Sequence, residues 1–171
     1  MSKRLDFHKV VVGRSEVLTF FDSEMEKVPA KVDTGAYRSA VHASNIHLDE
    51  ATGELSFDLL GGHPVCGNMQ KTIKTTDFDK AWVSNSFGHR EERFEVKLKV
   101  KLGPKVFKAR FTLANREKKI YPILIGRKLL NNRFLVDSAE SSLNRIELKR
   151  RYGIDFPNDE EEGRDENSNS V

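Results

Sequence analysis

The sequence has almost no cysteine and no long apolar run, the features that are typical of small secreted proteins and of membrane proteins. Its 171 residues contain one cysteine, Cys66, which excludes an internal disulfide and a zinc cluster built from thiolates. No apolar run approaches the roughly 20 residues of a membrane-spanning helix. Near the N-terminus the apolar run Val10 to Gly13 is too short for a secretory signal. We therefore expect a cytoplasmic protein without membrane contact, in which Cys66 is a small, semi-buried thiol.

Motifs for metal and nucleotide binding are also missing. The chain has neither a His-Glu-x-x-His motif nor a Gly-x-x-x-x-Gly-Lys-Ser/Thr loop. Its five histidines are scattered without the spacing of metal ligands: His8, His42, His47, His63 and His89. We expect no metal site and no cofactor.

Charge is distributed unevenly along the chain. Residues 157–171 contain six acids against Arg164, so this segment carries −5 and the rest of the chain +8. The acidic segment is too polar to fold and is predicted to be a disordered tail. The basic part lacks interleaved aromatic residues, which argues against nucleic-acid binding. We expect an arm over residues 1–8, one domain over 9–156 and the tail over 157–171.

Strand patterns dominate the domain. Residues 94–102 alternate apolar residues with lysines and 106–113 resume the alternation after Gly103-Pro104, which predicts a hairpin. We interpret the lysines as a solvent-facing row in preference to a phosphate site. A second hairpin is predicted over 45–59, and short strands over 10–13, 16–21 and 27–32. Helix is indicated only over 38–43 and 127–131. Without an internal repeat or a β-α-β pattern, these signals favour a closed or sandwiched antiparallel all-β fold.

Two motifs suggest a specific chemistry. Asp33-Thr34-Gly35-Ala36 directly follows a predicted strand, and much later the apolar run 121–125 breaks at Gly126-Arg127. Together they resemble the retroviral-type aspartic proteases. With residues 39–43 and 112–116, they resemble more narrowly the bacterial retropepsin-like family whose members carry the label ATP-dependent zinc protease. The resemblance implies a single-lobe, closed retropepsin-like barrel with one short helix after Gly126-Arg127.

Amide hydrolysis by water explains why such a site needs aspartates. One carboxylate removes a proton from the water while a carboxylic acid polarises the carbonyl, so two adjacent aspartates share one proton. The chain has a single Asp-Thr-Gly, at Asp33. Asp137-Ser138-Ala139 is the nearest imitation, but Ala139 lacks the freedom of glycine and a surface strand end is the preferred interpretation. We therefore expect a homodimer whose twofold axis brings two Asp33 residues together.

The resemblance implies roles for the residues of the motif. Asp33, Thr34 and Gly35 form the predicted catalytic loop, in which the Thr34 hydroxyl braces the two loops across the dimer and Gly35 permits close approach to substrate. Ala36 is a predicted substrate contact. Retroviral relatives have an aspartate at the position of Tyr37 that pairs with the arginine of the Gly-Arg motif, so the brace here must differ.

Other candidates have alternatives that the sequence leaves open. Gly61-Gly62 falls where retropepsins carry a mobile flap, or in an ordinary loop. Arg116 and Arg127 are predicted to bind carboxylates of the substrate, or to act as structural braces. His42 either orients neighbouring groups or is a satisfied structural histidine.

Two functions of different class follow. The first is a homodimeric aspartic-type endopeptidase acting on peptide or protein substrates, with acidic ones favoured because relatives are linked to ATP-grasp ligases that append glutamates. The second is a non-catalytic retropepsin-like module that binds such a ligase or a ribosomal component. The intact Asp33-Thr34-Gly35 favours the enzyme.

Overall fold

The computed structural model describes residues 8–85 and 87–153. The predicted acidic tail and nearly all of the predicted N-terminal arm lie outside these residues. The strands are β1 (Val10–Val12), β2 (Ser15–Phe20), β3 (Met25–Val32), β4 (Ser39–Asp49), β5 (Glu54–Leu59), β6 (Lys71–Thr75), β7 (Phe78–Ser84), β8 (Arg90–Leu102), β9 (Lys105–Ala114), β10 (Ile123–Ile125) and β11 (Phe134–Val136). The helices are α1 (Arg127–Leu130), α2 (Arg145–Tyr152) and the 3-10 turns η1 (Phe21–Ser23) and η2 (Pro64–Cys66).

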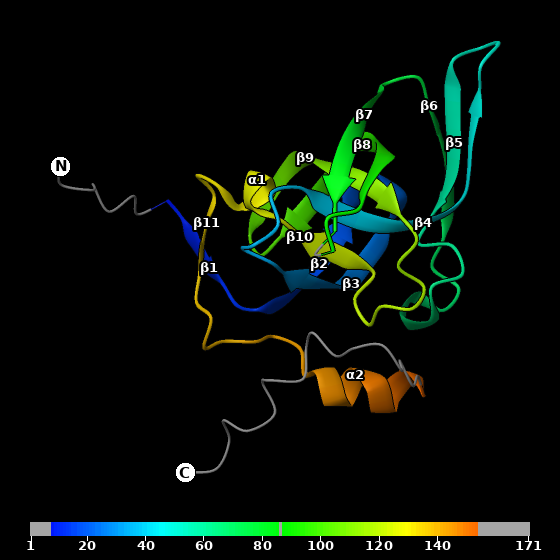
Figure 1. The fold of residues 1–171 in the computed structure, drawn as a ribbon. Helices are drawn as coiled ribbons and strands as arrows, with labels where there is room; N and C mark the ends of the chain where they lie inside the picture. Colours follow the sequence, from blue (N-terminus) through cyan, green and yellow to red (C-terminus); the bar gives the residue numbers. More distant parts are fainter. Residues whose placement is uncertain (1–7, 86, 154–171) are drawn as a thin grey trace, which may run out of the picture.

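Six strands close into a barrel. They pair in the order β10, β3, β2, β8, β9 and β4, and β4 returns to pair with β10. The hairpin β4–β5 projects from this barrel. In the view of Figure 1, α2 lies below the barrel. The prediction of a closed, single-lobe all-β barrel with a short helix after Gly126-Arg127 is confirmed.

The strand directions differ from the antiparallel expectation. β3 pairs with β10, β4 with β9 and β1 with β11 in parallel. Parallel strands need a long crossover, which usually contains a helix. Here the crossovers contain further strands instead of a long helix, so the sequence carries no β-α-β signal.

The helix predicted over 38–43 is wrong, because residues 39–43 form the buried start of β4. Ala40 and Val41 lie opposite β10 on one side and β9 on the other. Small and branched residues suit a strand that is buried on both faces. Conversely, α2 was not predicted, because it buries one residue fully, Leu148, and its sequence lacks an apolar stripe. Its start is set by the Asn144 side chain, which accepts hydrogen bonds from two backbone amides of the first turn.

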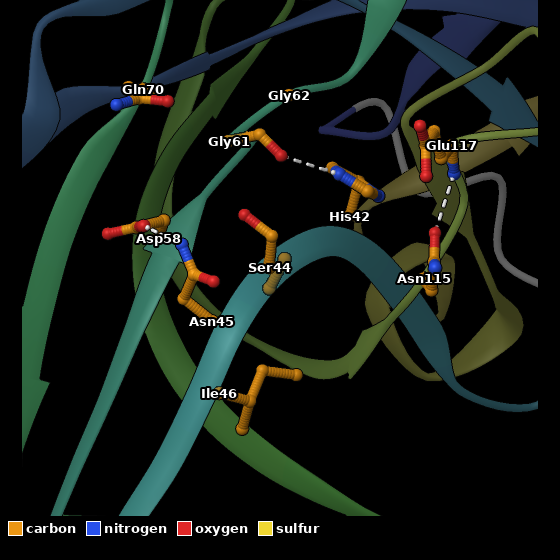
Figure 2. Close-up of a pocket in the computed structure, with 11 residues that line it drawn as sticks. His42, Ser44, Asn45, Ile46, Asp58, Gly61, Gly62, Gln70, Asn115 and Glu117 are labelled. Atoms are coloured by element: carbon orange, nitrogen blue, oxygen red, sulfur yellow. Dashed lines mark hydrogen bonds between the residues drawn. The ribbon is translucent and has the colours of Figure 1, made fainter.

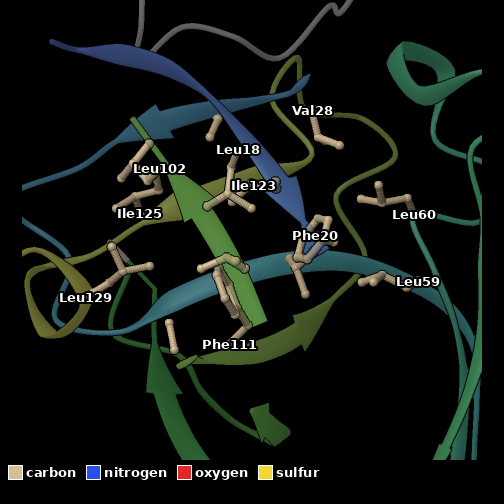
Figure 3. Close-up of a cluster of buried hydrophobic side chains, with 14 of the residues drawn as sticks. Leu18, Phe20, Val28, Leu59, Leu60, Leu102, Phe111, Ile123, Ile125 and Leu129 are labelled. Carbon is tan, nitrogen blue, oxygen red and sulfur yellow. The ribbon is translucent and has the colours of Figure 1, made fainter. Parts of the chain in front are cut away.

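Apolar side chains from every wall of the barrel meet in its centre. Leu18, Phe111 and Ile123 are fully buried there, and Figure 3 shows them converging from β2, β9 and β10. A smaller cluster joins Leu148 of α2 to Ile120 and Tyr121. The segment that leads into β10 is therefore packed against α2 through Ile120 and Tyr121, while β10 itself is packed in the barrel core through Ile123.

An internal repeat is present, contrary to the sequence expectation. Val10-Val11-Val12-Gly13-Arg14 corresponds to Ile123-Leu124-Ile125-Gly126-Arg127. β1 lies parallel to β11 with Val12 opposite Val136, as β10 lies parallel to β3 with Ile125 opposite Val32. The repeat is only five residues long, so the sequence alone does not reveal it. It becomes evident in the structure, because each copy pairs in parallel with another strand.

The turns that follow β3 and β11 match as well. The amide of Asp137 donates to the Val12 carbonyl at 2.9 Å, as that of Asp33 donates to Ile125 at 2.9 Å. The amide of Arg14 donates to the Glu140 carbonyl at 2.8 Å, and that of Arg127 to Ala36 at 2.8 Å. Asp137-Ser138-Ala139 is thus an exposed structural counterpart of the Asp33 turn at the end of a surface strand.

Candidate functional site

The backbone fixes the orientation of the Asp33 carboxylate. Asp33 directly follows β3, and its Oδ1 accepts hydrogen bonds from the amides of Gly35 at 2.9 Å and Ala36 at 3.3 Å. Its own amide donates to Ile125 of β10. Asp33 is half-buried while Thr34 and Gly35 are exposed. One carboxylate oxygen is therefore held by the turn, and the outer face of the turn is open to another molecule.

Arg127 braces the turn. Its Nη1 donates to the carbonyl oxygens of Thr34 and Gly35, both at 2.9 Å, and its guanidinium lies 5.9 Å from the centre of the Tyr37 ring. The backbone carbonyls and an aromatic face thus take the place of the aspartate that retroviral relatives have at position 37. Of the two predicted interpretations of Arg127, the contacts match the structural brace.

Gly126 allows the two segments to pack closely. A Cβ at this position would lie 2.5 Å from the Arg38 carbonyl oxygen and 3.0 Å from that of Ala36. Its amide donates to the Ser39 hydroxyl at 3.0 Å. Residues 126–128 therefore lie directly on residues 36–38, which holds the Asp33 turn against β10 and α1.

Arg116 and His42 lie at the other end of β10. The His42 amide bonds the carbonyl of Pro122, whereas that of Asp33 bonds Ile125, so roughly 10 Å of strand separate the two positions. The Arg116 amide donates to His42 Nδ1 at 2.9 Å, so the His42 proton is on Nε2, which donates to the Gly61 carbonyl at 2.9 Å. Both ring nitrogens are used, as expected of a structural histidine.

Gly61 and Gly62 border a separate pocket. Gly61 is buried, and a Cβ there would lie 2.6 Å from the Ser44 hydroxyl. Together with His42, Asn45 and Glu117 they line a hollow of about 570 Å³, and among the described residues that line it none belongs to the Asp33 turn (Figure 2). Close packing beside β4 thus explains Gly61, and its position matches the ordinary loop rather than the flap.

His63 supports the segment that carries Arg116. Its Nε2 bonds the carbonyls of Arg116 at 2.9 Å and Lys119 at 3.0 Å, and its ring meets that of His42 edge-on at 5.0 Å. Burial, and secondly the neighbouring His42, lower the pKa of His63 to about 4. Burial also lowers the pKa of His42. The pair is neutral at pH 7, and its hydrogen bonds hold the chain that leads into β10.

We expect the stability of the protein to decrease as pH falls from about 6.5 to 4. In this range the unfolded chain binds a proton at His63 and the folded one does not, so the free energy of unfolding falls by about 3 kcal/mol. Urea unfolding at pH 7 and pH 4 measures this difference. His47→Gln, at an exposed position, should keep the decrease, whereas His63→Gln should reduce it. An unchanged decrease in His63→Gln would contradict the assignment.

Cys66 is more deeply placed than the sequence suggests. It is 3% exposed, and burial raises the pKa of its thiol to about 12. The thiolate that reacts with electrophiles is therefore scarce at neutral pH.

Three charged residues of the site were not predicted. Glu95 of β8 is 4% exposed and bonds Arg38, and Lys128 lies 3.9 Å away. Glu95 is the one acid in the strand 94–102, whose other charged residues are lysines. That exception to the pattern was the signal that could have identified it.

The described residues contain no group of three or more His, Cys, Asp or Glu side chains placed to hold a metal ion. Within the same ranges, none of the helices has the length and apolar character needed to span a bilayer.

Known proteins are similar to this chain in sequence and in fold. Probable alpha-L-glutamate ligases from Shewanella halifaxensis (strain HAW-EB4) and Desulfotalea psychrophila (strain LSv54 / DSM 12343) are each 31% identical to this chain, over 86% and 78% of its length. The chain spans about a third of these relatives, 33% and 29%. A crystal structure of the protein Lpg0085, of unknown function, from Legionella pneumophila subsp. pneumophila str. Philadelphia 1 matches with a TM-score of 0.58. It is 28% identical, and the match covers 77% of this chain and 95% of that one. The family model for the retropepsin-like aspartic endopeptidase RimB matches residues 11–147, and the chain therefore belongs to the RimB-like family.

Proposed function

We propose that the protein is a cytoplasmic, homodimeric aspartic-type endopeptidase that hydrolyses acidic, glutamate-bearing peptides. The observation that carries this proposal is the geometry of the Asp33 turn, in which two backbone amides hold one carboxylate oxygen and Arg127 fixes the turn from behind. Membership of a family of aspartic endopeptidases supports it.

A second copy completes the chemistry. One Asp33, as carboxylate, takes a proton from the attacking water, while Asp33 of the second copy, as acid, donates to the carbonyl oxygen of the substrate. The exposed Thr34 and Gly35 leave the turn open for this contact. Val11 of β1 and Leu135 of β11, 59% and 50% exposed, lie opposite each other and offer apolar surface to a partner. They lie on the side of the barrel where Figure 1 shows β1, β11 and α1.

Several cations surround the turn and favour acidic substrates. Beside the Arg127 brace, the side chains of Arg38 and Lys128 are 32% and 40% exposed. A substrate carboxylate can form charge-assisted hydrogen bonds with such groups. The relatives are named probable alpha-L-glutamate ligases, and about a third of their length is similar to this chain. Their name also supports a glutamate-bearing substrate.

The ligase names also favour the second candidate, a module that binds a ligase without catalysis. In that case the carboxylate of Asp33 is dispensable. Cleavage and its dependence on Asp33 separate the two functions.

Glutamate-rich peptides should be cleaved about tenfold faster than neutral ones at low salt. A charge-assisted contact is worth about 1.5 to 3 kcal/mol, and the preference should shrink at high salt because exposed charges are screened. Rates for the two peptide sets at low and high ionic strength measure it.

Arg116→Gln is the matched control. Arg116 Nε donates to the Tyr121 carbonyl at 3.0 Å, at the far end of β10 from Asp33, so this variant should lose stability and keep the acidic preference. Equal rates for the two sets at low salt would exclude an acidic substrate. Loss of the preference in Arg116→Gln would instead place this guanidinium in the substrate site.

A further inference from the structure

Glu95 is a buried carboxylate surrounded by cations. Its Oε2 lies 2.6 Å from Arg38 Nη1, and its Oε1 lies 3.7 Å from Arg110 Nη1 and 3.9 Å from Lys128 Nζ. The Glu95 side chain is 5% exposed, whereas the three cations are one-third to two-fifths exposed. A carboxylate this deep is costly unless it is paired, so its pairing with these cations determines how they are placed.

Two of the cations belong to the two segments that form the Asp33 site. Arg38 ends the turn that begins at Asp33, and Lys128 lies in α1 next to the Arg127 brace. The segments are joined by backbone hydrogen bonds from Arg127 to the Ala36 carbonyl and from Lys128 to that of Tyr37, at 2.8 and 2.9 Å.

Glu95 itself comes from a third element. It lies on β8 opposite Asp79 of β7, so one carboxylate connects the β7–β8 hairpin, the Asp33 turn and α1. Asp79 is bonded to Arg110 as well, but its side chain is 59% exposed. Glu95 and Asp79 are therefore a buried and an exposed acid at facing positions of the same hairpin, and their variants can be compared directly.

Removal of the Glu95 charge should drive the segments apart. Arg38, Arg127 and Lys128 are like charges on two facing stretches of backbone, and the buried carboxylate is the counter-charge between Arg38 and Lys128. Without it their mutual repulsion acts directly on the hydrogen bonds that join residues 36–37 to 127–128.

We propose that Glu95 is a positioning residue that acts through Arg38 to fix the Asp33 turn against α1. The effect of this residue on catalysis rests on the proposed peptidase function, whereas its effect on the turn does not. Glu95 contacts no reacting atom, so its loss should lower kcat and affect KM little.

The test compares Glu95→Gln with Asp79→Asn in the full chain. Hydrogen exchange at the amides of Arg127 and Lys128 should be at least tenfold faster in Glu95→Gln and unchanged in Asp79→Asn. The Gly53 amide, bonded to Asp49 in the distant β4–β5 hairpin, should be unaffected in both. On a cleaved neutral peptide, which does not use the cations around Glu95 for binding, kcat should fall ten- to a hundredfold in Glu95→Gln with KM within threefold. Both should stay within twofold in Asp79→Asn.

Arg38→Gln tests the same link from the partly exposed side. It should reproduce the faster hydrogen exchange, and in that measurement the double variant Glu95→Gln/Arg38→Gln should be no worse than the more impaired single one. This variant decides the question if Glu95→Gln fails to fold. Unchanged exchange at Arg127 and Lys128, or equal effects of the Glu95 and Asp79 variants, would overturn the proposal. If the unmodified protein cleaves no peptide, the peptidase proposal fails, and hydrogen exchange alone decides the role of Glu95.

Discussion

Replacement of Asp33 by Asn should lower peptide cleavage by about three to four orders of magnitude and leave the fold intact. An amide can neither remove a proton from water nor share one with the facing carboxyl group. Its oxygen can still accept the hydrogen bonds that Asp33 Oδ1 receives from Gly35 and Ala36, so the turn should keep its conformation. Initial rates on a peptide substrate and thermal unfolding measure the two parts of the prediction.

Mixing the variant with the unmodified protein tests whether one active site uses two chains. If subunits exchange freely, mixed dimers hold a single carboxyl group and are inactive, so an equimolar mixture retains about half of the original activity. Light scattering gives the oligomeric state of the same samples. Activity that is unaffected by the added variant, or a strictly monomeric active protein, would contradict the two-aspartate site. Full activity of Asp33→Asn would exclude the aspartic mechanism altogether.

Gly126→Ala should reduce the free energy of unfolding by about 3 kcal/mol or more. The new Cβ would lie 2.5 Å from the Arg38 carbonyl oxygen, and the atoms that it meets are backbone atoms and not the ends of flexible side chains. Relief of this clash requires residues 36–38 to move away from 126–128, which breaks the hydrogen bonds from Arg127 and Lys128. Urea unfolding measures the loss.

Two other glycines serve as controls. Gly13 occupies the equivalent position of the repeat, where a Cβ would lie 2.4 Å from the Glu140 carbonyl oxygen, and Gly13→Ala should also be clearly destabilising. Gly53 has a φ of 70°, and a Cβ added there would meet no atom within 4 Å, so Gly53→Ala should cost only about 1 kcal/mol. A Gly126→Ala variant no less stable than Gly53→Ala would show that the two segments can separate freely.

Local motifs carried most of what the sequence could predict. Asp33-Thr34-Gly35 and Gly126-Arg127 are short, and each directly follows a strand. Their resemblance to the retropepsin-like family predicted the barrel and the short helix α1. The hairpin at Gly103 was equally accessible, because alternation and turn are contiguous.

Long-range placement could not be predicted from the same patterns. Arg116 precedes β10 and Arg127 follows it, but the sequence does not show which end of β10 packs against the Asp33 turn. Of the two, Arg127 reaches that turn. Glu95 occupies a strand position like those of its lysine neighbours. Its burial depends on α1 and Arg38, which are remote in the sequence. Hydrophobic alternation records which residues face the core, but it does not identify the element that covers the other face.

The hydrogen bond between Arg127 and Thr34 joins residues 93 positions apart in the chain. β10 enters the barrel between β3 and β4, which precede it by most of the domain. Contacts that close such long loops form late and slowly during folding. While the chain is being synthesised, residues 33–36 emerge from the ribosome long before residues 123–127 exist to hold them. A nascent chain can therefore expose Asp33, but it cannot yet build the surroundings that orient its carboxylate.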